Sequence, residues 1–330
     1  MAIKTVRGKH PGMTALKSAL LTAATLLACG SAAGQAFPTR PITVIYNNLA
    51  GSGGDILTRL GSAEASRILG QPVIVENRAG ANGRLGLAAL RAAPGDAHVL
   101  NVVNNALVVF QPIADTAFKF EPEKDYVPVS VLFESPLVLT ASPAMPFRDM
   151  KGLIGYAKTN PGKLNFAITA GASSHFLAER LTRALDIKVT LIPYKGENAG
   201  TAAMLGGQTD LLFGTVVKPL VDAGKMVALA TTGGTRWKPF PDTPTLREAG
   251  VPFAAPVWYP MIAPAGTPAA VVKVLNAAFE QAYRTPEVAK RLDDMGFTAP
   301  SMAPAETLAY VRSELDAWRP VIQSAGIKLE

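Results

Sequence analysis

The stretch from Ile42 to Leu69 constrains the fold most strongly, because it reads as a strand, a glycine-rich loop and a helix in direct succession. Alternating apolar residues from Ile42 to Ile45 are typical of a strand. The glycines of Gly51-Ser52-Gly53-Gly54 allow a sharp turn and a close approach of the backbone to a ligand. Asp55 is expected as the N-cap of the helix, which ends at Gly70. Since the first N–H groups of a helix point outward at the positive end of its dipole, the loop predicts a site for a carboxylate or phosphate.

The spacing of the glycines argues against nucleotide-binding loops. A dinucleotide fingerprint, G-x-G-x-x-G, counted from Gly51 requires a third glycine where Ile56 stands. A Walker A loop requires Lys and then Ser or Thr after its last glycine, whereas Gly54 precedes Asp55, whose charge repels a triphosphate. An ordinary tight turn between a strand and a helix is the alternative interpretation.

Residues 1–36 have the pattern of a secretory signal peptide. They contain four basic residues and no acid, and the apolar run from Ala19 to Ala28 is too short to span a bilayer. Cleavage after Ala36 gives a mature chain that begins at Phe37. The alternative is a lipoprotein signal, in which Cys29 carries the lipid and anchors the domain to a membrane. Cys29 is the only cysteine, so cleavage at Ala36 leaves no internal disulfide.

The charge balance argues against a nucleic-acid partner. Subtracting the four positive charges of the leader from the formal net charge of +7 leaves about +3 for the mature domain. No run of Lys and Arg is interleaved with aromatic residues, as a nucleic-acid surface requires. The mature chain is long enough for two domains of ordinary size, and its charge is compatible with a small anionic ligand.

Short apolar runs alternate with helical patterns along the rest of the chain. Strands are expected at Val73–Val75, Val99–Val103, Val129–Phe133 and Leu137–Thr140, with a helix over Met150–Thr159. This alternation predicts an α/β protein with βαβ units and a mainly parallel sheet, and ligands are expected beyond the carboxyl ends of its strands.

The segment from Leu164 to Asp186 repeats the opening arrangement. A strand at Asn165–Ile168 leads into the loop Thr169-Ala170-Gly171-Ala172-Ser173-Ser174, and a helix begins near His175. Two such units, one in each half of the chain, are able to direct two sets of backbone N–H groups into one cleft. Ser173 and Ser174 either cap their own helix or bind the ligand.

His175 beside two serines raises the alternative of a secreted serine hydrolase. A triad requires a base within hydrogen-bond reach of the nucleophile, but the chain has no G-x-S-x-G motif. The mature chain has only two histidines, His98 and His175, and no cysteine, so no metal site is expected. His175 is expected to pack at the helix start or to donate a hydrogen bond. We therefore expect no catalytic residue, metal or cofactor.

Later segments add weaker candidates for ligand contact. Lys195, after the strand Val189–Ile192, either meets an anion or is solvated, and Thr215 lies at another strand end. Trp258 and Tyr259 either line a cleft or pack at a hinge. Long helices are expected over Pro268–Tyr283 and Pro304–Arg319, with Pro320 ending or kinking the second.

Motifs in order along the whole mature chain resemble one family. They are Phe37-Pro38-Thr39-Arg40-Pro41-Ile42, the Gly51–Asp55 loop, Leu69–Gly80, Asn160–Phe166, Ser173-Ser174-His175, Pro193-Tyr194-Lys195-Gly196 and Ala263–Pro268. Together they are similar to the Bug family, the extracytoplasmic solute receptors of tripartite tricarboxylate transporters.

The resemblance implies a type II-like periplasmic binding protein fold of two α/β domains with the ligand cleft between them. The expected domains are residues 37–137 with 257–330, and residues 138–256. The implied partners are a small carboxylate and the subunits of a membrane permease, and the receptor is expected to be a monomer. A receptor that serves a sensor kinase instead of a permease is an open alternative. The ligand-binding residues implied are Asn47, Asn48, Gly51, Ser52, Gly53, Gly54, Asp55, Thr169, Gly171, Ala172, Ser173, Ser174, His175 and Thr215.

Two departures from the family pattern bear on the ligand. Asn47 and Asn48 stand where the family usually has proline and an aromatic residue, and Gly214 and Thr215 stand where it has an Asp-Asn pair. The second change removes a charged acceptor that is able to face an amino group. A ligand without an ammonium group is therefore expected.

Overall fold

The computed structural model describes residues 1–2, 37–115 and 117–325. The chain divides into two compact units, Met1–Thr39 and Arg40–Glu330, and the second holds every strand and helix named below. Apart from Met1 and Ala2, the predicted signal peptide lies outside the described residues, and so does Cys29. Within the described ranges, no helix combines the length and apolar character that crossing a membrane requires.

The first sheet has five strands in the order β2-β1-β3-β10-β4. The strands are β1 (Ile42–Tyr46), β2 (Val73–Asn77), β3 (Val99–Val102), β4 (Tyr126–Ser135) and β10 (Val257–Pro264). β1 pairs in parallel with β2 and β3, whereas β10 runs antiparallel to β3 and β4. β1 and β4 are buried along most of their length, as expected for strands covered on both faces.

The second sheet has five strands in the order β7-β6-β8-β5-β9. They are β5 (Val138–Ala141), β6 (Asn165–Ile168), β7 (Thr190–Pro193), β8 (Leu211–Gly214) and β9 (Val227–Thr231). β6 pairs in parallel with β7 and β8, and β5 runs antiparallel to β8 and β9. The prediction of a mainly parallel sheet is therefore wrong, because both sheets are mixed. The chain passes from one sheet to the other after β4 and again before β10, and a periodicity pattern does not reveal such a change of sheet.

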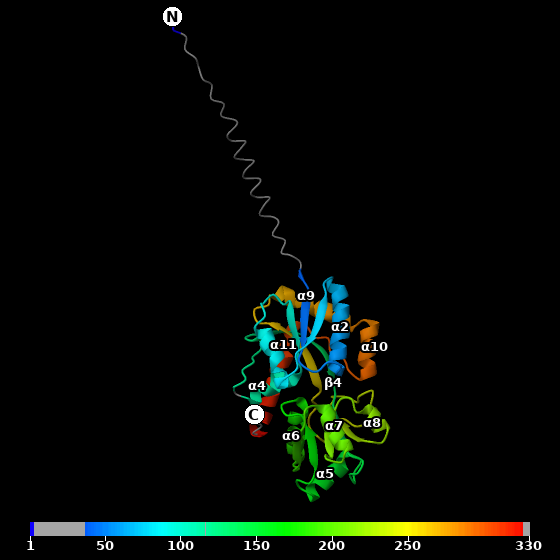
Figure 1. The fold of residues 1–330 in the computed structure, drawn as a ribbon. Helices are drawn as coiled ribbons and strands as arrows, with labels where there is room; N and C mark the ends of the chain where they lie inside the picture. Colours follow the sequence, from blue (N-terminus) through cyan, green and yellow to red (C-terminus); the bar gives the residue numbers. More distant parts are fainter. Residues whose placement is uncertain (3–36, 116, 326–330) are drawn as a thin grey trace. The chain divides into compact units, whose positions relative to one another are not determined.

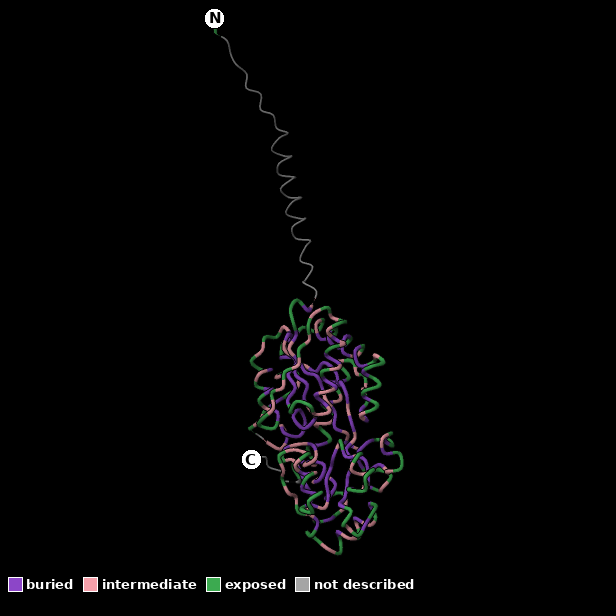
Figure 2. The backbone as a smooth tube through the Cα atoms, turned by 45° about the vertical axis from the view of Figure 1, so that its right-hand side comes forward, coloured by how far each residue is buried: buried purple, intermediate pink, exposed green. Residues whose placement is uncertain are grey.

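Helices cover both sheets (Figure 1). We call each sheet with its helices a lobe. In the first lobe they are α2 (Gly53–Leu69), η2 (Ala81–Gly83), α3 (Arg84–Arg91), η3 (Ala106–Phe110), α4 (Gln111–Ala114), α9 (Ala269–Tyr283), α10 (Pro286–Met295) and α11 (Pro304–Ala325). In the second lobe they are α5 (Met150–Thr159), α6 (Ser173–Leu185), α7 (Glu197–Leu205) and α8 (Lys218–Asp222). Buried residues lie in the interior of the tube and exposed residues lie mostly along its outside (Figure 2).

Pro320 was expected to end or to kink helix α11, and the first alternative is wrong. The helix continues through Pro320 to Ala325. Trp318 and Ile322, on either side of the proline, are both fully buried. This apolar packing stabilises the last turns and compensates for the N–H that proline lacks.

The lobes share apolar and polar contacts. Phe110 of η3 packs against Phe176 of α6 and Trp318 of α11, with ring centroids 4.9 Å and 4.4 Å away. Trp237 donates from Nε1 to the backbone oxygen of Gly296 at 2.6 Å. The strands of the second sheet all lie between residues 138 and 231, although the domain limits at 137/138 and 256/257 stay a prediction.

Candidate functional site

A cleft of about 650 Å³ is lined by four loops, two from each lobe. They follow β1, β2, β6 and β7, and the pairs β1–β2 and β6–β7 are parallel neighbours. Helices begin after each loop, so the cleft lies at the carboxyl ends of strands and near helix N-termini. The lining residues are Asn47, Asn48, Leu49, Ala79, Gly80, Ala81, Asn82, Gly83, Thr169, Ala170, Pro193, Tyr194, Lys195 and Gly196.

Three of the predicted site residues line this cleft: Asn47, Asn48 and Thr169. The others belong to segments next to the lining residues or, for Thr215, to the loop after β8. These others are Gly51, Ser52, Gly53, Gly54, Asp55, Gly171, Ala172, Ser173, Ser174, His175 and Thr215. Their part in ligand binding stays a prediction, and their contacts are described next.

The start of α2 is capped by Ser52, and the prediction of Asp55 as N-cap is wrong. The Ser52 hydroxyl accepts from the backbone N–H of Asp55 at 3.4 Å. The Asp55 carboxylate, which is 3% exposed, accepts from Gly51 N at 2.9 Å, from Asn77 Nδ2 at 2.8 Å and from Arg59 Nε at 3.1 Å. Burial alone raises the pKa of Asp55, but these hydrogen bonds and the Arg59 charge outweigh it and lower the pKa. The N–H of Gly51 is thus already bound within the loop.

The glycines of this loop accommodate neighbouring side chains of the first lobe. A Cβ at Gly54 would lie 2.1 Å from the Tyr46 hydroxyl oxygen, so only glycine fits over that group. A Cβ at Gly53 would lie 3.3 Å from Met295 Cε. The close backbone approach at Gly54 is therefore to Tyr46, and an approach of this loop to a ligand stays a prediction.

The loop before α6 uses its polar side chains internally. The Ser173 hydroxyl donates to Asn105 Oδ1 at 3.0 Å, and the Ser174 hydroxyl accepts from Thr169 N at 3.2 Å. His175 was expected to pack or to donate: its ring lies beside that of Phe176, with centroids 5.5 Å apart, and its Nδ1 accepts from the backbone N–H of Gly171 at 3.3 Å. Burial lowers the pKa of His175, because it disfavours the charged imidazolium.

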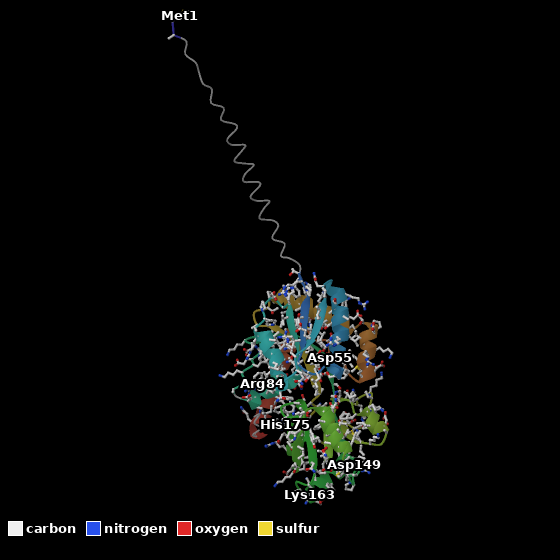
Figure 3. The ribbon with its side chains drawn as sticks, in the orientation of Figure 1. Met1, Asp55, Arg84, Asp149, Lys163 and His175 are labelled. Atoms are coloured by element: carbon white, nitrogen blue, oxygen red, sulfur yellow. The ribbon has the colours of Figure 1, made fainter. Side chains whose placement is uncertain are left out.

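The N-cap position of α6 is Ala172, which supplies no side-chain cap. Neither serine therefore acts as the N-cap that the sequence allowed. Both serines are bound to groups other than the imidazole, so these contacts do not assemble a serine–histidine pair. Figure 3 labels His175 in the second lobe and Asp55 in the first.

Glu197, which the sequence reasoning did not single out, holds the loop that contains Thr215. Its carboxylate accepts from Thr215 N at 2.7 Å, from Thr215 Oγ1 at 2.8 Å and from Val216 N at 3.2 Å. Both carboxylate oxygens are therefore bound by the loop after β8.

The loop at 79–83 is the part of the cleft that the sequence reasoning missed, and in the loop at 193–196 it named only Lys195 as a weaker candidate. The available signal was the position of both loops directly after strands. Asn47 connects the first of them to the Asn47–Leu49 segment, because its Nδ2 donates to Gly83 O at 2.7 Å. Lys195 is the only charged residue among the described residues that line the cleft.

Burial and ring contacts locate the two aromatic side chains of β10, Trp258 and Tyr259. Trp258 is fully buried and packs on Tyr310, with ring centroids 4.9 Å apart, so it does not line the cleft. Tyr259 packs on Phe133 at 4.8 Å. In the described part of the chain, no group of three or more His, Cys, Asp or Glu side chains is placed to hold a metal ion.

Residues 57–327 match the profile of the tripartite tricarboxylate transporter family receptor, TctC. Protein BugT of Bordetella pertussis is 30% identical, with 89% of this chain aligned to 92% of BugT. MatC of Rhodopseudomonas palustris, solved with bound malate, is 32% identical with a TM-score of 0.77, and 87% of this chain covers all of MatC. The periplasmic binding protein BugD is 28% identical with a TM-score of 0.78, and 88% of this chain covers 99% of BugD. The expected two-domain α/β fold of periplasmic binding proteins is thereby confirmed.

Proposed function

Because the chain belongs to the tripartite tricarboxylate transporter receptor family, we propose that it is a periplasmic receptor that binds a small carboxylate between its lobes and delivers it to the transporter permease. The family consists of solute-binding receptors and not of enzymes, so the serine hydrolase alternative is excluded. The proposal includes export by the signal peptide of residues 1–36 and action as a monomer. The observation that carries it is the charge of the cleft lining, which has Lys195 and no acid among its described residues.

Two carboxylates near the lining residues in sequence, Asp55 and Glu197, are hydrogen-bonded by groups outside the cleft lining. Asp55 is bound by Gly51, Asn77 and Arg59, and Glu197 by the loop after β8. Lys195 is an exposed residue of the lining. An anion that enters the cleft therefore meets one cation, the amide groups of asparagines and nearby helix N-termini.

We propose that the loops at Asn47–Asp55 and Thr169–His175 provide the hydrogen bonds to one carboxylate. Asn47, Asn48 and Thr169 support this assignment because they line the cleft, while Ser52, Asp55, Ser173 and Ser174 hold the loops in shape. A hydrogen bond to a charged group contributes roughly 1.5–3 kcal/mol. A few such bonds reach the ~8 kcal/mol of a micromolar complex.

The ligand is proposed to have no ammonium group. Gly214 and Thr215, which stand where the family has an Asp-Asn pair, offer no carboxylate, and Thr215 donates to Glu197. Calorimetric titration with malate and with aspartate tests this point, because the two differ only in a hydroxyl against an ammonium group. Tighter binding of aspartate would reject it.

A thermal-shift screen against carboxylates tests the proposed function. A ligand that binds only the native state at about 100 times its Kd stabilises that state by about 2.7 kcal/mol. We expect a rise in Tm with at least one di- or hydroxycarboxylate, malate among them, and a smaller rise in a Lys195→Gln variant. No shift with any carboxylate at high concentration would refute the proposal.

A further inference from the structure

Gln111 is a buried amide that joins two loops of the cleft without lining it. It begins α4 directly after the π-helix η3, and it is 2% exposed. Its Nε2 donates to the backbone oxygen of Asn82 at 3.1 Å and to that of Gly171 at 3.3 Å. Asn82 belongs to the first lobe and Gly171 to the second. One side chain therefore holds a loop from each side of the cleft.

Arg84 fixes the orientation of this amide. Its Nε donates to Gln111 Oε1 at 3.0 Å, and because a guanidinium only donates, the amide oxygen has to face it. The amide nitrogen is thereby turned toward the two backbone oxygens. Arg84 is itself held by an ion pair with Asp115 at 2.8 Å, and its Cζ lies 4.1 Å from the centroid of the Phe118 ring. In Figure 3, Arg84 lies on the first lobe near the second, where His175 is labelled.

The loop on the first-lobe side depends on such support. Four consecutive residues have positive φ: 129° at Gly80, 46° at Ala81, 54° at Asn82 and 90° at Gly83. Residues with a side chain rarely adopt these angles and keep them only where the surroundings hold them in place. Two hydrogen bonds hold this loop in place: Gln111 donates to Asn82 O, and Asn47 donates to Gly83 O.

We infer that Gln111 is a positioning residue for ligand binding, which fixes the spacing between the Ala79–Gly83 loop and the Thr169–Gly171 loop. Ligand contact with one lobe is thereby coupled to the placement of the other lobe. Gln111 also binds two backbone oxygens that would otherwise repel an anion near them. The inference rests on the proposed function of the cleft.

Gln111→Glu tests this coupling. The glutamate has nearly the same shape and accepts from Arg84, but its carboxylate has no proton for the oxygens of Asn82 and Gly171. In the ligand-free protein, we expect hydrogen exchange at the backbone amides of both loops to become about tenfold faster. Faster exchange in only one of the loops, or in neither, would overturn the inference.

Asn105→Asp is the matched control from the same segment. Asn105 donates to Pro256 O at 3.2 Å and accepts from Ser173 Oγ, and no hydrogen bond joins it to the described residues of the Ala79–Gly83 loop. Exchange in that loop is expected to keep its wild-type rate. If Gln111→Glu does not give the wild-type circular dichroism spectrum, Gln111→Met, which also lacks the donor, is used for the same comparison.

Calorimetry with malate as the probe gives the second measurement. We expect Gln111→Glu to bind malate about tenfold more weakly than the wild type. An unchanged affinity in a folded variant would contradict the inference. Failure of the wild type to bind malate bears on the proposed ligand class, whereas the exchange comparison in the ligand-free protein still decides the coupling.

Discussion

Replacing Asp55 by asparagine tests the network that shapes the first loop. One Asp55 oxygen accepts from both Gly51 N and Arg59 Nε, and the other accepts from Asn77 Nδ2. Asparagine has one acceptor oxygen and one donor nitrogen, so at least one of these donors will face another donor. The perturbation therefore removes the charge and at least one hydrogen bond while it keeps the shape of the side chain.

The expected loss is about 2–4 kcal/mol in the free energy of unfolding. A hydrogen bond to a charged group contributes roughly 1.5–3 kcal/mol, and a buried donor without a partner adds to the loss. The ion pair with Arg59 adds less, because the arginine side chain is 45% exposed and screened by solvent. At roughly 2–4 °C per kcal/mol for a chain of this size, the Tm is expected to fall by about 5–15 °C.

Thermal unfolding at several pH values measures this loss. Because the pKa of Asp55 is lowered in the folded protein, the carboxylate stabilises the fold above its ordinary pKa of 3.8, and this stability is lost as the pH falls through the lowered pKa. The difference in Tm between wild type and Asp55→Asn is thus largest near about pH 7 and shrinks below about pH 4.

A matched control is Asp222→Asn, which removes an exposed ion pair with Lys218 at 2.5 Å. Such a pair contributes only ~0.5 kcal/mol, so its Tm is expected to stay close to that of the wild type. The reasoning would be refuted if Asp55→Asn were as stable as Asp222→Asn at neutral pH, or if its deficit did not change on acidification.

Three further predictions concern the cleft and its supporting loops. Lys195→Gln should weaken malate binding by about tenfold in calorimetry without changing the Tm of the ligand-free protein, and equal affinity would remove Lys195 from the site. Gly86→Ala should lower the free energy of unfolding by about 1–3 kcal/mol in urea, because the added Cβ would lie 2.2 Å from Asn47 Oδ1. Gly155→Ala is the control: its Cβ would meet open space, so this variant should be neutral or stabilising. Burial lowers the pKa of His175 in the folded protein, so the wild type loses stability as the pH drops below 6.5. His175→Gln should therefore lose less stability than the wild type between about pH 7 and pH 5, and an identical dependence of stability on pH would contradict this.

The local elements of this protein follow from the sequence. The strand, glycine loop and helix at 42–69 are present as β1 and α2, and the second unit forms β6 and α6. Such elements depend on the local sequence: the spacing of apolar residues sets the type of element, and glycine and proline set where it ends. The sequence motifs also indicated the receptor family, which the family match confirms.

Only the tertiary structure decided which polar groups form hydrogen bonds with one another. The sequence predicted Asp55 as the helix cap, but Ser52 takes that position, and the Asp55 carboxylate is bound by Arg59 and Asn77 instead. Gln111 had no local signal at all, because its partners lie 29 and 60 residues away in sequence.

The same limit applies to the cleft. The sequence predicted two loops, at Asn47–Asp55 and Thr169–His175, and only their first residues reach the lining. The other two lining loops are brought there by the pairing of β2 beside β1 and of β7 beside β6. Strand order and sheet exchange arise from long-range hydrogen bonding and the burial of shared apolar faces, which a pattern along the chain does not encode. The sequence thus determined the kind of loop that follows these strands, and the packing of the two sheets determined which loops meet at the cleft.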